Sequence, residues 1–413
     1  MATTVTKSAP AGIELTPRET NSITDTRVAQ LNDPSARPGE ASETSEEQKL
    51  IAEPDYPQGL AFWSIMLAAG LAVMLVGLDT TIVATAVPAI TDHFHTVSDI
   101  GWYSTAFRLS MCSFQFLFGK LYKIFSVKRI FLTTLTIFQL GVLLCATASS
   151  SKMFVFGRAI AGLGSAGVIA GCFTLIVQIL PLRLRPLWTS VLGGAEALAI
   201  IAAPLLGGVL TEKLSWRWCF WISLPLGAIT MIVVAFVLNN PQKRGGEGMA
   251  WKEKLHQLDL IGTLVFLPSL TCLFIALSWA GTKYPWTDPK ILGLLVTFVV
   301  LLAIFAWDQH RKQDSATLPP RIIKRRSVIA GFIFSVCCNS AANVIEYYMP
   351  TYFQAIKEYS PAKSGYMMLP FIIGTLIGTL MQGGGTSTIG YYVPFMLLGS
   401  TLMPVAVGLM TTW

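Results

Sequence analysis

The chain alternates long apolar segments with short polar connections. Eleven segments approach or exceed the roughly 20 residues that a helix needs to cross about 30 Å of hydrocarbon. They cover residues 60–83, 102–121, 130–148, 154–180, 187–210, 219–238, 258–277, 291–306, 328–353, 365–381 and 391–410. The eighth, 291–306, is the shortest. The pattern predicts an all-α polytopic membrane protein with about 11 transmembrane helices.

Composition agrees with this prediction. Hydrophobic residues make up 53% of the chain, and only 13% of residues are charged, against about 25% in a soluble domain. Residues 1–57 differ, because they are rich in Ser, Thr, Pro and Glu and carry a net charge of −5. They also lack the apolar core of a signal peptide. We expect a disordered acidic cytoplasmic tail there, followed by a first helix that serves as the insertion signal.

Basic residues alternate between the connections. Sixteen Lys and Arg lie in the second, fourth, sixth and eighth connections, and seven lie in the others. This placement favours a membrane topology over a nucleic-acid partner, and the positive-inside rule places the N-terminus in the cytosol. We expect a multi-pass protein of the plasma membrane, with the vacuolar membrane as the alternative.

Five ionisable residues fall within the apolar segments. They are Asp79, Arg108, Arg158, Glu196 and Glu346. A charge at the centre of a membrane helix costs about 2.5–3.5 kcal/mol, so such residues are functional candidates by default. The alternatives are a water-facing helix-end acid for Asp79 and a structural cation for Arg108. Glu346 could face the outer vestibule, with a structural role as its alternative. Arg158 and Glu196 lie on consecutive segments, which predicts that they are neighbours.

Residues 162–167 fit the dinucleotide pattern G-x-G-x-x-G. However, no strand precedes them and no acid follows about 20 residues later. Small-residue helix packing is the better interpretation, and Gly167 and Gly171 add a G-x-x-x-G pair.

His93 and His95, with Asp92 and Asp99, fall in a predicted outer loop. Their ligand set is too small for a strong metal site, which favours a solvated loop. The chain has no Walker A sequence. We therefore predict no enzyme activity, no catalytic residue, no metal and no cofactor.

Four segments carry family motifs. Residues 78–88 match L-D-x-T-I-V-x-x-A-x-P, and residues 156–162 are similar to a fourth-helix motif built around Arg158. Residues 119–129 are similar to the loop G-x-L-x-D-R-x-G-R-R/K, with Lys123 replacing the acid and Ser126 the second glycine. Residues 203–208 are similar to the antiporter motif G-P-x-x-G-G, with Ala203 replacing the first glycine.

The chain thus resembles the major facilitator superfamily, specifically the fourteen-span drug:proton antiporters and their fungal toxin-efflux branch. The resemblance implies export of small apolar or amphipathic compounds, such as drugs and mycotoxins, by proton antiport. It also implies three groups of site residues: Asp79, Arg158 and Glu196 for proton coupling; Arg108 and Glu346 on the transport path; and Gly119, Lys120, Arg129, Pro204, Gly207 and Gly208 in gating. The alternatives are uptake of a nutrient or iron chelate, or a non-transporting fragment. The expected partners are protons, a small-molecule substrate and the lipid bilayer.

The resemblance also divides the chain. We expect the acidic tail at 1–57, an N-terminal six-helix bundle at 58–240, an amphipathic linker with two linker helices at 241–320, and three helices of a C-terminal bundle at 321–413. Because the family has fourteen helices, the sequence predicts an incomplete C-terminal bundle and a shortened gene model or fragment.

Overall fold

The structure is a computed structural model. It describes residues 59–96, 99–238, 254, 257–281, 283–313, 316–359 and 361–410. The expected acidic tail at 1–57 and most of the expected amphipathic linker lie outside the described residues. The described part belongs to one compact unit, 57–413.

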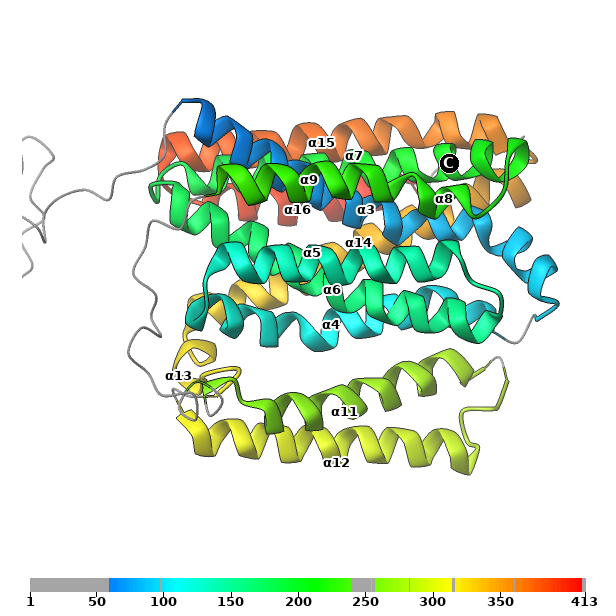
Figure 1. Ribbon diagram of the computed structural model, residues 1–413, viewed down its shortest axis with the longest axis horizontal. Helices are drawn as coiled ribbons and strands as arrows, with labels where there is room; N and C mark the ends of the chain where they lie inside the picture. Colours follow the sequence, from blue (N-terminus) through cyan, green and yellow to red (C-terminus); the bar gives the residue numbers. More distant parts are fainter. Residues whose placement is uncertain are drawn as a thin grey trace, which may run out of the picture. The chain divides into compact units, whose positions relative to one another are not determined.

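The described residues form a succession of helices that run along one common direction (Figure 1). In chain order they are α3 (Leu60–Phe94), α4 (Ile100–Ile124), α5 (Val127–Ala146), α6 (Ser151–Ile179), α7 (Arg185–Lys213), α8 (Trp218–Trp221), α9 (Ser223–Val237), α11 (Leu260–Trp279), α12 (Pro289–Lys312), α13 (Pro320–Ile323), α14 (Arg326–Ala355), α15 (Pro361–Ile389) and α16 (Val393–Met410).

The helices confirm the all-α prediction and correct some of its bounds. The segment 219–238 coincides with α8 and α9, and the other ten segments each coincide with one helix. The first helix continues through Pro88 to Phe94 instead of ending at residue 83. The eighth segment extends to 24 residues, because its apolar core is followed by polar residues that continue the same helix.

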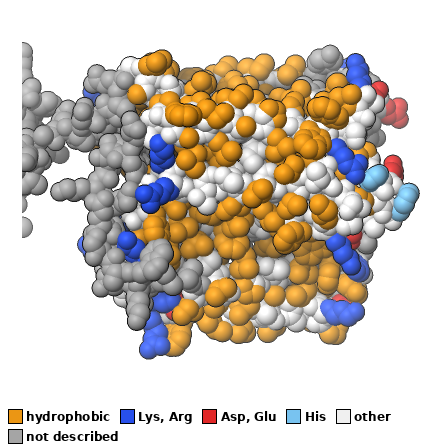
Figure 2. Space-filling model, in the orientation of Figure 1, with side chains coloured by type: hydrophobic (Ala, Val, Ile, Leu, Met, Phe, Trp, Pro, Cys, Tyr) orange, Lys and Arg blue, Asp and Glu red, His pale blue; other side chains and the backbone are white. Residues whose placement is uncertain are grey.

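Nine helices within the described residues are long and apolar enough to cross a membrane. Helix α4 falls below this threshold, and its Arg108 and Gln115 lower its hydropathy. Helix α16 contributes only the shorter apolar stretch Val393–Leu409. Figure 2 shows apolar side chains over the middle of the visible face, with Lys and Arg side chains toward the two ends. This distribution fits a bilayer around the helices.

The main hydrophobic core lies within helices α3 to α9, where it extends from Ile65 to Leu238. Glycines allow α6 to approach α4 and α5 closely. A Cβ on Gly162 would overlap the carbonyl of Phe107, and a Cβ on Gly164 would overlap the backbone of Phe138. These contacts confirm the small-residue packing predicted for the G-x-G-x-x-G segment.

Helix α7 packs against α3 on one side and α15 on another. Thr81 of α3 donates a hydrogen bond to the carbonyl of Ile200 at 3.1 Å. At the other contact, Arg183 and Ser387 exchange hydrogen bonds: Arg183 Nε donates to the Ser387 carbonyl at 3.3 Å, and Ser387 Oγ donates to the Arg183 carbonyl at 2.8 Å. Within the core, α7 and the connection before it therefore provide the contact with α15.

Helices α11 and α12 pack as an antiparallel hairpin, and α11 also contacts α4. A Cβ on Gly101 of α4 would lie 3.5 Å from the Ser278 hydroxyl of α11. About four turns further along α4, the rings of Phe116 and Phe266 have their centroids 5.9 Å apart. The hairpin therefore follows α4 along much of its length.

Candidate functional site

Asp79 and Arg158 form a buried ion pair between α3 and α6. The Arg158 Nη1 atom donates to Asp79 Oδ2 at 2.5 Å, and each side chain is only 1% exposed. Breaking a buried pair by removing one partner is expensive, because it leaves the other charge uncompensated in a low-dielectric interior. The two residues therefore act as one electrostatic unit.

Two further contacts from α4 fix the guanidinium. Its Nε donates to the Tyr103 carbonyl at 3.0 Å, and its Cζ lies 4.4 Å from the centroid of the Phe107 ring. The Nη2 atom donates to the carbonyl of Asp79 itself at 3.4 Å. Since α3, α4 and α6 all contribute, a change in the charge of Asp79 would act on the contact between three helices.

The Tyr103 side chain belongs to a second polar group near the start of α6. Its hydroxyl lies 3.0 Å from the Ser151 hydroxyl and 3.2 Å from Thr96 Oγ1, and Ser151 donates to Asp99 Oδ2 at 2.7 Å. The side chain of Tyr103 thus contacts this polar group, while its backbone carbonyl contacts the Arg158 guanidinium. The sequence analysis did not single out Tyr103 or Ser151.

Glu196 does not lie beside Arg158, so the predicted proximity of these residues is wrong. Instead, the backbone of Glu196 faces α3, where a Cβ on Gly77 would lie 3.0 Å from the Glu196 carbonyl. The reason is the packing order, since α7 rests on α3 and makes little contact with α6. The Glu196 side chain is half-buried, and no described residue forms an ion pair with it.

Arg108 and Glu346 were predicted to lie on the transport path, and the structure describes the side chain of Arg108 only. Arg108 of α4 is exposed, and no described acid forms an ion pair with it. Glu346 lies in α14, but its side chain is outside the described residues. Their predicted roles stay predictions.

The residues predicted to act in gating have unequal surroundings. Gly207 is buried, and a Cβ there would overlap Thr85 Oγ1 of α3, whereas one on Gly208 would meet nothing within 4 Å. Pro204 lies inside α7. Arg129 is exposed, and its backbone amide donates to the Ser126 hydroxyl that caps α5. Gly207 is thus required for close α3–α7 packing, whatever its part in transport.

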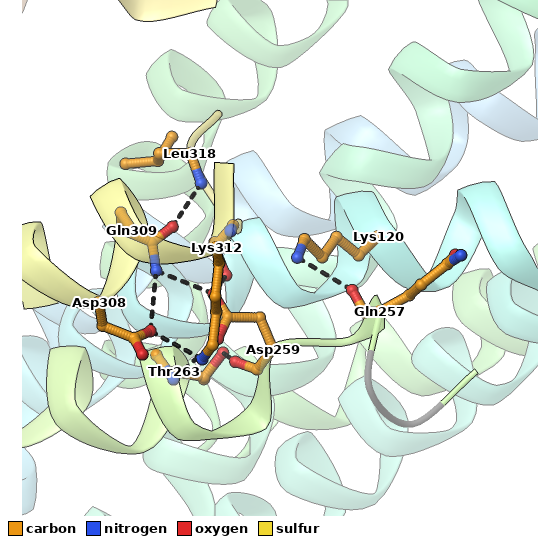
Figure 3. Close-up of polar contacts among 10 residues, drawn as sticks. Lys120, Gln257, Asp259, Thr263, Asp308, Gln309, Lys312 and Leu318 are labelled. Carbon is orange, nitrogen blue, oxygen red and sulfur yellow. Dashed lines mark hydrogen bonds and ion pairs between the residues drawn. The ribbon is translucent and has the colours of Figure 1, made fainter. Parts of the chain in front are cut away.

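Lys120 lies near the end of α4 beside the α11–α12 hairpin. Its Nζ donates to the Gln257 carbonyl at 2.9 Å, as Figure 3 shows. Gly119, one residue earlier, is exposed, with nothing within 4 Å of a Cβ. Lys120, one of the residues predicted to act in gating, therefore contacts the chain directly before α11.

Asp259 organises a polar cluster at the base of the hairpin (Figure 3). Its Oδ1 accepts from the Gly262 amide at 3.1 Å and from Lys312 Nζ at 2.6 Å. Its Oδ2 accepts from Gln309 Nε2 at 2.8 Å and from both the amide and the hydroxyl of Thr317, at 3.0 and 2.6 Å. We call this group the Asp259 clamp. Although burial opposes ionisation, these hydrogen bonds hold the pKa of Asp259 well below its usual range.

The sequence analysis did not single out Asp259. The available signal was an acid directly before an apolar run, the position of a helix N-cap. Asp259 does cap α11. Its contacts with Gln309, Lys312 and Thr317 could not be predicted, because they join residues at least 50 positions apart.

Among the described residues, no group of three or more His, Cys, Asp or Glu could hold a metal ion. The predicted outer loop is partly helical, because His93 lies in the last turn of α3 and His95 follows as its C-cap. His93 Nε2 lies 3.3 Å from Arg217 Nη2. Hydrogen bonding and ring packing thus account for this histidine.

The sequence matches the Major Facilitator Superfamily over residues 69–413. The chain belongs to this family. It is 43% identical over 355 residues to the MFS-type efflux pump MFS1 of Arthroderma benhamiae, covering 86% of this chain and 66% of the relative. It is 41% identical over 378 residues to the MFS-type transporter phomT of Diaporthe leptostromiformis, covering 91% of this chain and 64% of the relative. The chain thus spans slightly less than two thirds of these relatives.

A solved structure supports the same fold. The proton:xylose symporter XylE, bound to 6-bromo-6-deoxy-D-glucose, aligns with a TM-score of 0.50 over 78% of this chain and 69% of the symporter, at 15% identity. The family assignment confirms the resemblance that the motifs indicated and, with the helical structure, the polytopic fold. It does not test the predicted site residues or the division into domains.

Proposed function

We propose that the chain functions in proton-coupled export of small apolar or amphipathic compounds. The observation that carries the proposal is the buried pair of Asp79 and Arg158, an acid and a base at membrane depth with almost no exposure. Ionisable residues within membrane helices usually pair with one another and mark substrate or proton paths. The names of the fungal relatives, an efflux pump among them, support the direction of transport.

In the proposed cycle, Asp79 exchanges a proton with the outer medium. Protonation neutralises the carboxylate, so Arg158 loses its counter-charge and the contacts among α3, α4 and α6 change in energy. A ligand shifts two conformations only by its differential affinity for them. We propose that the proton and the exported compound favour opposite conformations, and that Glu196 is the second candidate for the proton carrier.

The energy available is modest. One proton moving down about 100 mV supplies roughly 2.3 kcal/mol. Since 1.4 kcal/mol is about a tenfold ratio, voltage alone would support roughly a 40-fold gradient per proton. We further propose a cytosolic N-terminus and a plasma-membrane location, which would place the end of α4 with Lys120 and the start of α5 with Arg129 on the cytosolic side.

Proteoliposomes provide the test, with a fluorescent apolar cation as the transported compound. Flux should depend on the pH gradient and should be lost in Asp79→Asn at equal protein density. Undiminished coupling in Asp79→Asn would exclude this residue as the carrier and leave Glu196→Gln as the next variant to measure. Gradient-driven accumulation in the same direction as the protons would instead indicate uptake.

A binding measurement tests the coupling between the proton and the compound independently of transport. If Asp79 is the carrier, binding of the compound to the purified chain should release a proton, and its affinity should fall as the pH is lowered. Binding with proton release but without flux would indicate a non-transporting fragment that retains the site. Binding with no dependence on pH would contradict the coupling itself.

A further inference from the structure

A cavity of about 400 Å³ lies between the end of α4 and the segment that follows α12. This volume is within the range of small-molecule pockets, roughly 300–1,000 Å³. Its described lining includes Gly119, Lys120 and Lys123 of α4, and Thr317 and Pro319 beyond α12. We call it the α4 basic cavity. It takes no part in the contacts of Asp79 and Arg158.

The described lining of the cavity carries positive charge. Lys120 and Lys123 are the charged residues in its described lining, which contains no acid. A third cation is close, because Lys254 Nζ lies 5.9 Å from the ring of Phe125, which follows the lining residue Ile124.

Two described acids near the cavity, Asp259 and Asp308, are engaged with another cation. Asp259 and Asp308 both contact Lys312 Nζ, at 2.6 and 2.8 Å. Asp259 also accepts from Gln309 and Thr317, so both of its oxygens are used within the clamp. Together Asp259, Asp308 and Lys312 carry a net charge of −1, which is smaller in magnitude than the charge of Lys120, Lys123 and Lys254.

The clamp also builds the wall of the cavity. Asp259 binds Thr317 through both its amide and its hydroxyl, which places Thr317 and the residues after it opposite α4. On the other wall, the hydrogen bond to the Gln257 carbonyl holds the Lys120 ammonium in place (Figure 3). A cavity whose walls are fixed before binding loses less entropy when a ligand arrives.

We propose that the α4 basic cavity binds a phosphate-bearing anion, with Lys120 and Lys123 as the residues that recognise it. Basic pockets between membrane helices at the cytosolic surface suit anionic headgroups, and lysine binds phosphate as a point charge. The family loop motif has an acid where this chain has Lys123, so this position adds a positive charge in place of a negative one. The anion comes from a lipid headgroup or from a soluble phosphate compound.

The test uses the purified chain in a neutral detergent, with two probes. One probe is phosphatidylglycerol, compared with phosphatidylcholine; the other is soluble glycerol phosphate. The readouts are the lipid retained in native mass spectrometry and the shift in the thermal unfolding midpoint. Lys120→Gln/Lys123→Gln is the test variant, and Lys152→Gln/Lys213→Gln is the control, because it removes the same charge at exposed positions at the other end of the helices.

We expect phosphatidylglycerol to bind more tightly than phosphatidylcholine, and we expect Lys123→Gln to weaken it about fivefold. The double variant should lose the preference, and the control should keep it. Lys123→Asp, which restores the acid of the family motif, should also lose it. Lys123 is exposed, so these single variants are not expected to impair folding.

The outcomes distinguish the two sources of the anion. Protection by phosphatidylglycerol alone indicates a lipid headgroup, and equal protection by glycerol phosphate indicates a soluble phosphate compound. Equal binding of both lipids by the unmodified chain would overturn the proposal. So would a preference that the control variant reduces as much as Lys120→Gln/Lys123→Gln does.

Discussion

The guanidinium of Arg158 lies over the ring of Phe107, with Cζ 4.4 Å from the ring centroid. Phe107 is fully buried, and its carbonyl is the group that a Cβ on Gly162 would overlap. The ring of Phe107 therefore stabilises the Arg158 guanidinium, and the backbone of Phe107 limits how closely α6 can approach α4. The ion pair and the glycine packing of α6 depend on one another.

Arg158→Ala should lower the stability of the α3–α9 core. It leaves Asp79 buried without its counter-charge, and breaking such a pair costs about 3–5 kcal/mol. Thermal unfolding in detergent would measure the change. Arg129→Ala, at an exposed position, is the control and should change stability by less than about 0.5 kcal/mol. Asp79→Asn/Arg158→Gln should recover part of the loss, and failure to recover any would mean that the pair is not the source of the effect.

Arg158→Lys should separate charge from geometry in the proposed transport. Lysine keeps the positive charge but has no planar fork, so it cannot donate to the Tyr103 carbonyl and Asp79 with the same geometry. In Arg158→Lys we expect proton-driven flux that is reduced but present. In Arg158→Ala we expect the flux to be lost or its pH optimum to be shifted. An unchanged profile in Arg158→Ala would show that the arginine does not tune the acid.

Gly162→Ala should lower the stability of the protein and Gly208→Ala should raise it, although the chemical change is the same. At Gly162 the added methyl group overlaps the Phe107 carbonyl, and overpacking of this kind costs about 1–3 kcal/mol. At Gly208 nothing lies within 4 Å, and alanine is favoured over glycine in a helix by about 1 kcal/mol. The unfolding midpoints of the two variants check this. Equal midpoints would mean that α4 and α6 are less closely packed than described.

The Asp259 clamp should be insensitive to pH until the medium is strongly acidic. A depressed pKa means that the folded state favours the carboxylate, so the stabilisation is complete above the unfolded pKa of about 3.9. It is lost as the pH falls through the lower folded pKa. The backbone amides of α11 and α12 should therefore be similarly protected against hydrogen exchange at pH 7 and pH 5, and this protection should weaken below about pH 4.

The same clamp has a matched pair of variants. Asp259→Asn should destabilise the hairpin at neutral pH by about 1.5–3 kcal/mol, because it loses hydrogen bonds to a charged acceptor. Asp308→Asn removes a helical i,i+4 contact with Lys312 that is partly exposed, so we expect only about 0.3–0.5 kcal/mol. Similar losses in both variants would argue against the central role of Asp259.

Sequence patterns predicted the helices well, because the apolar runs that cross a membrane are also helical. The runs could not define where helices end beyond the apolar core, as at Phe94 and Lys312. The interpretation of the glycines near residue 162 as packing residues was also available from the sequence, since the expected strand and acid were missing.

The candidate site was only partly predictable. The cost of burying charge singled out Asp79 and Arg158 separately, but it could not say that they are partners. Adjacency along the chain favoured Glu196 instead, whereas the packing of α7 on α3 places Glu196 against Gly77. Tyr103 contributes a backbone carbonyl to Arg158, and no side-chain pattern can reveal a contact of that kind.

The glycine contacts of α6 have a mechanical consequence. With backbone against backbone at Gly162 and Gly164, α4, α5 and α6 cannot turn or slide past one another without a collision. Any large conformational change must therefore carry these three helices together as one rigid block. Bending would be concentrated in the helices that flank the block. One of these is α7, and the connection that precedes it is hydrogen-bonded to α15 through Arg183 and Ser387.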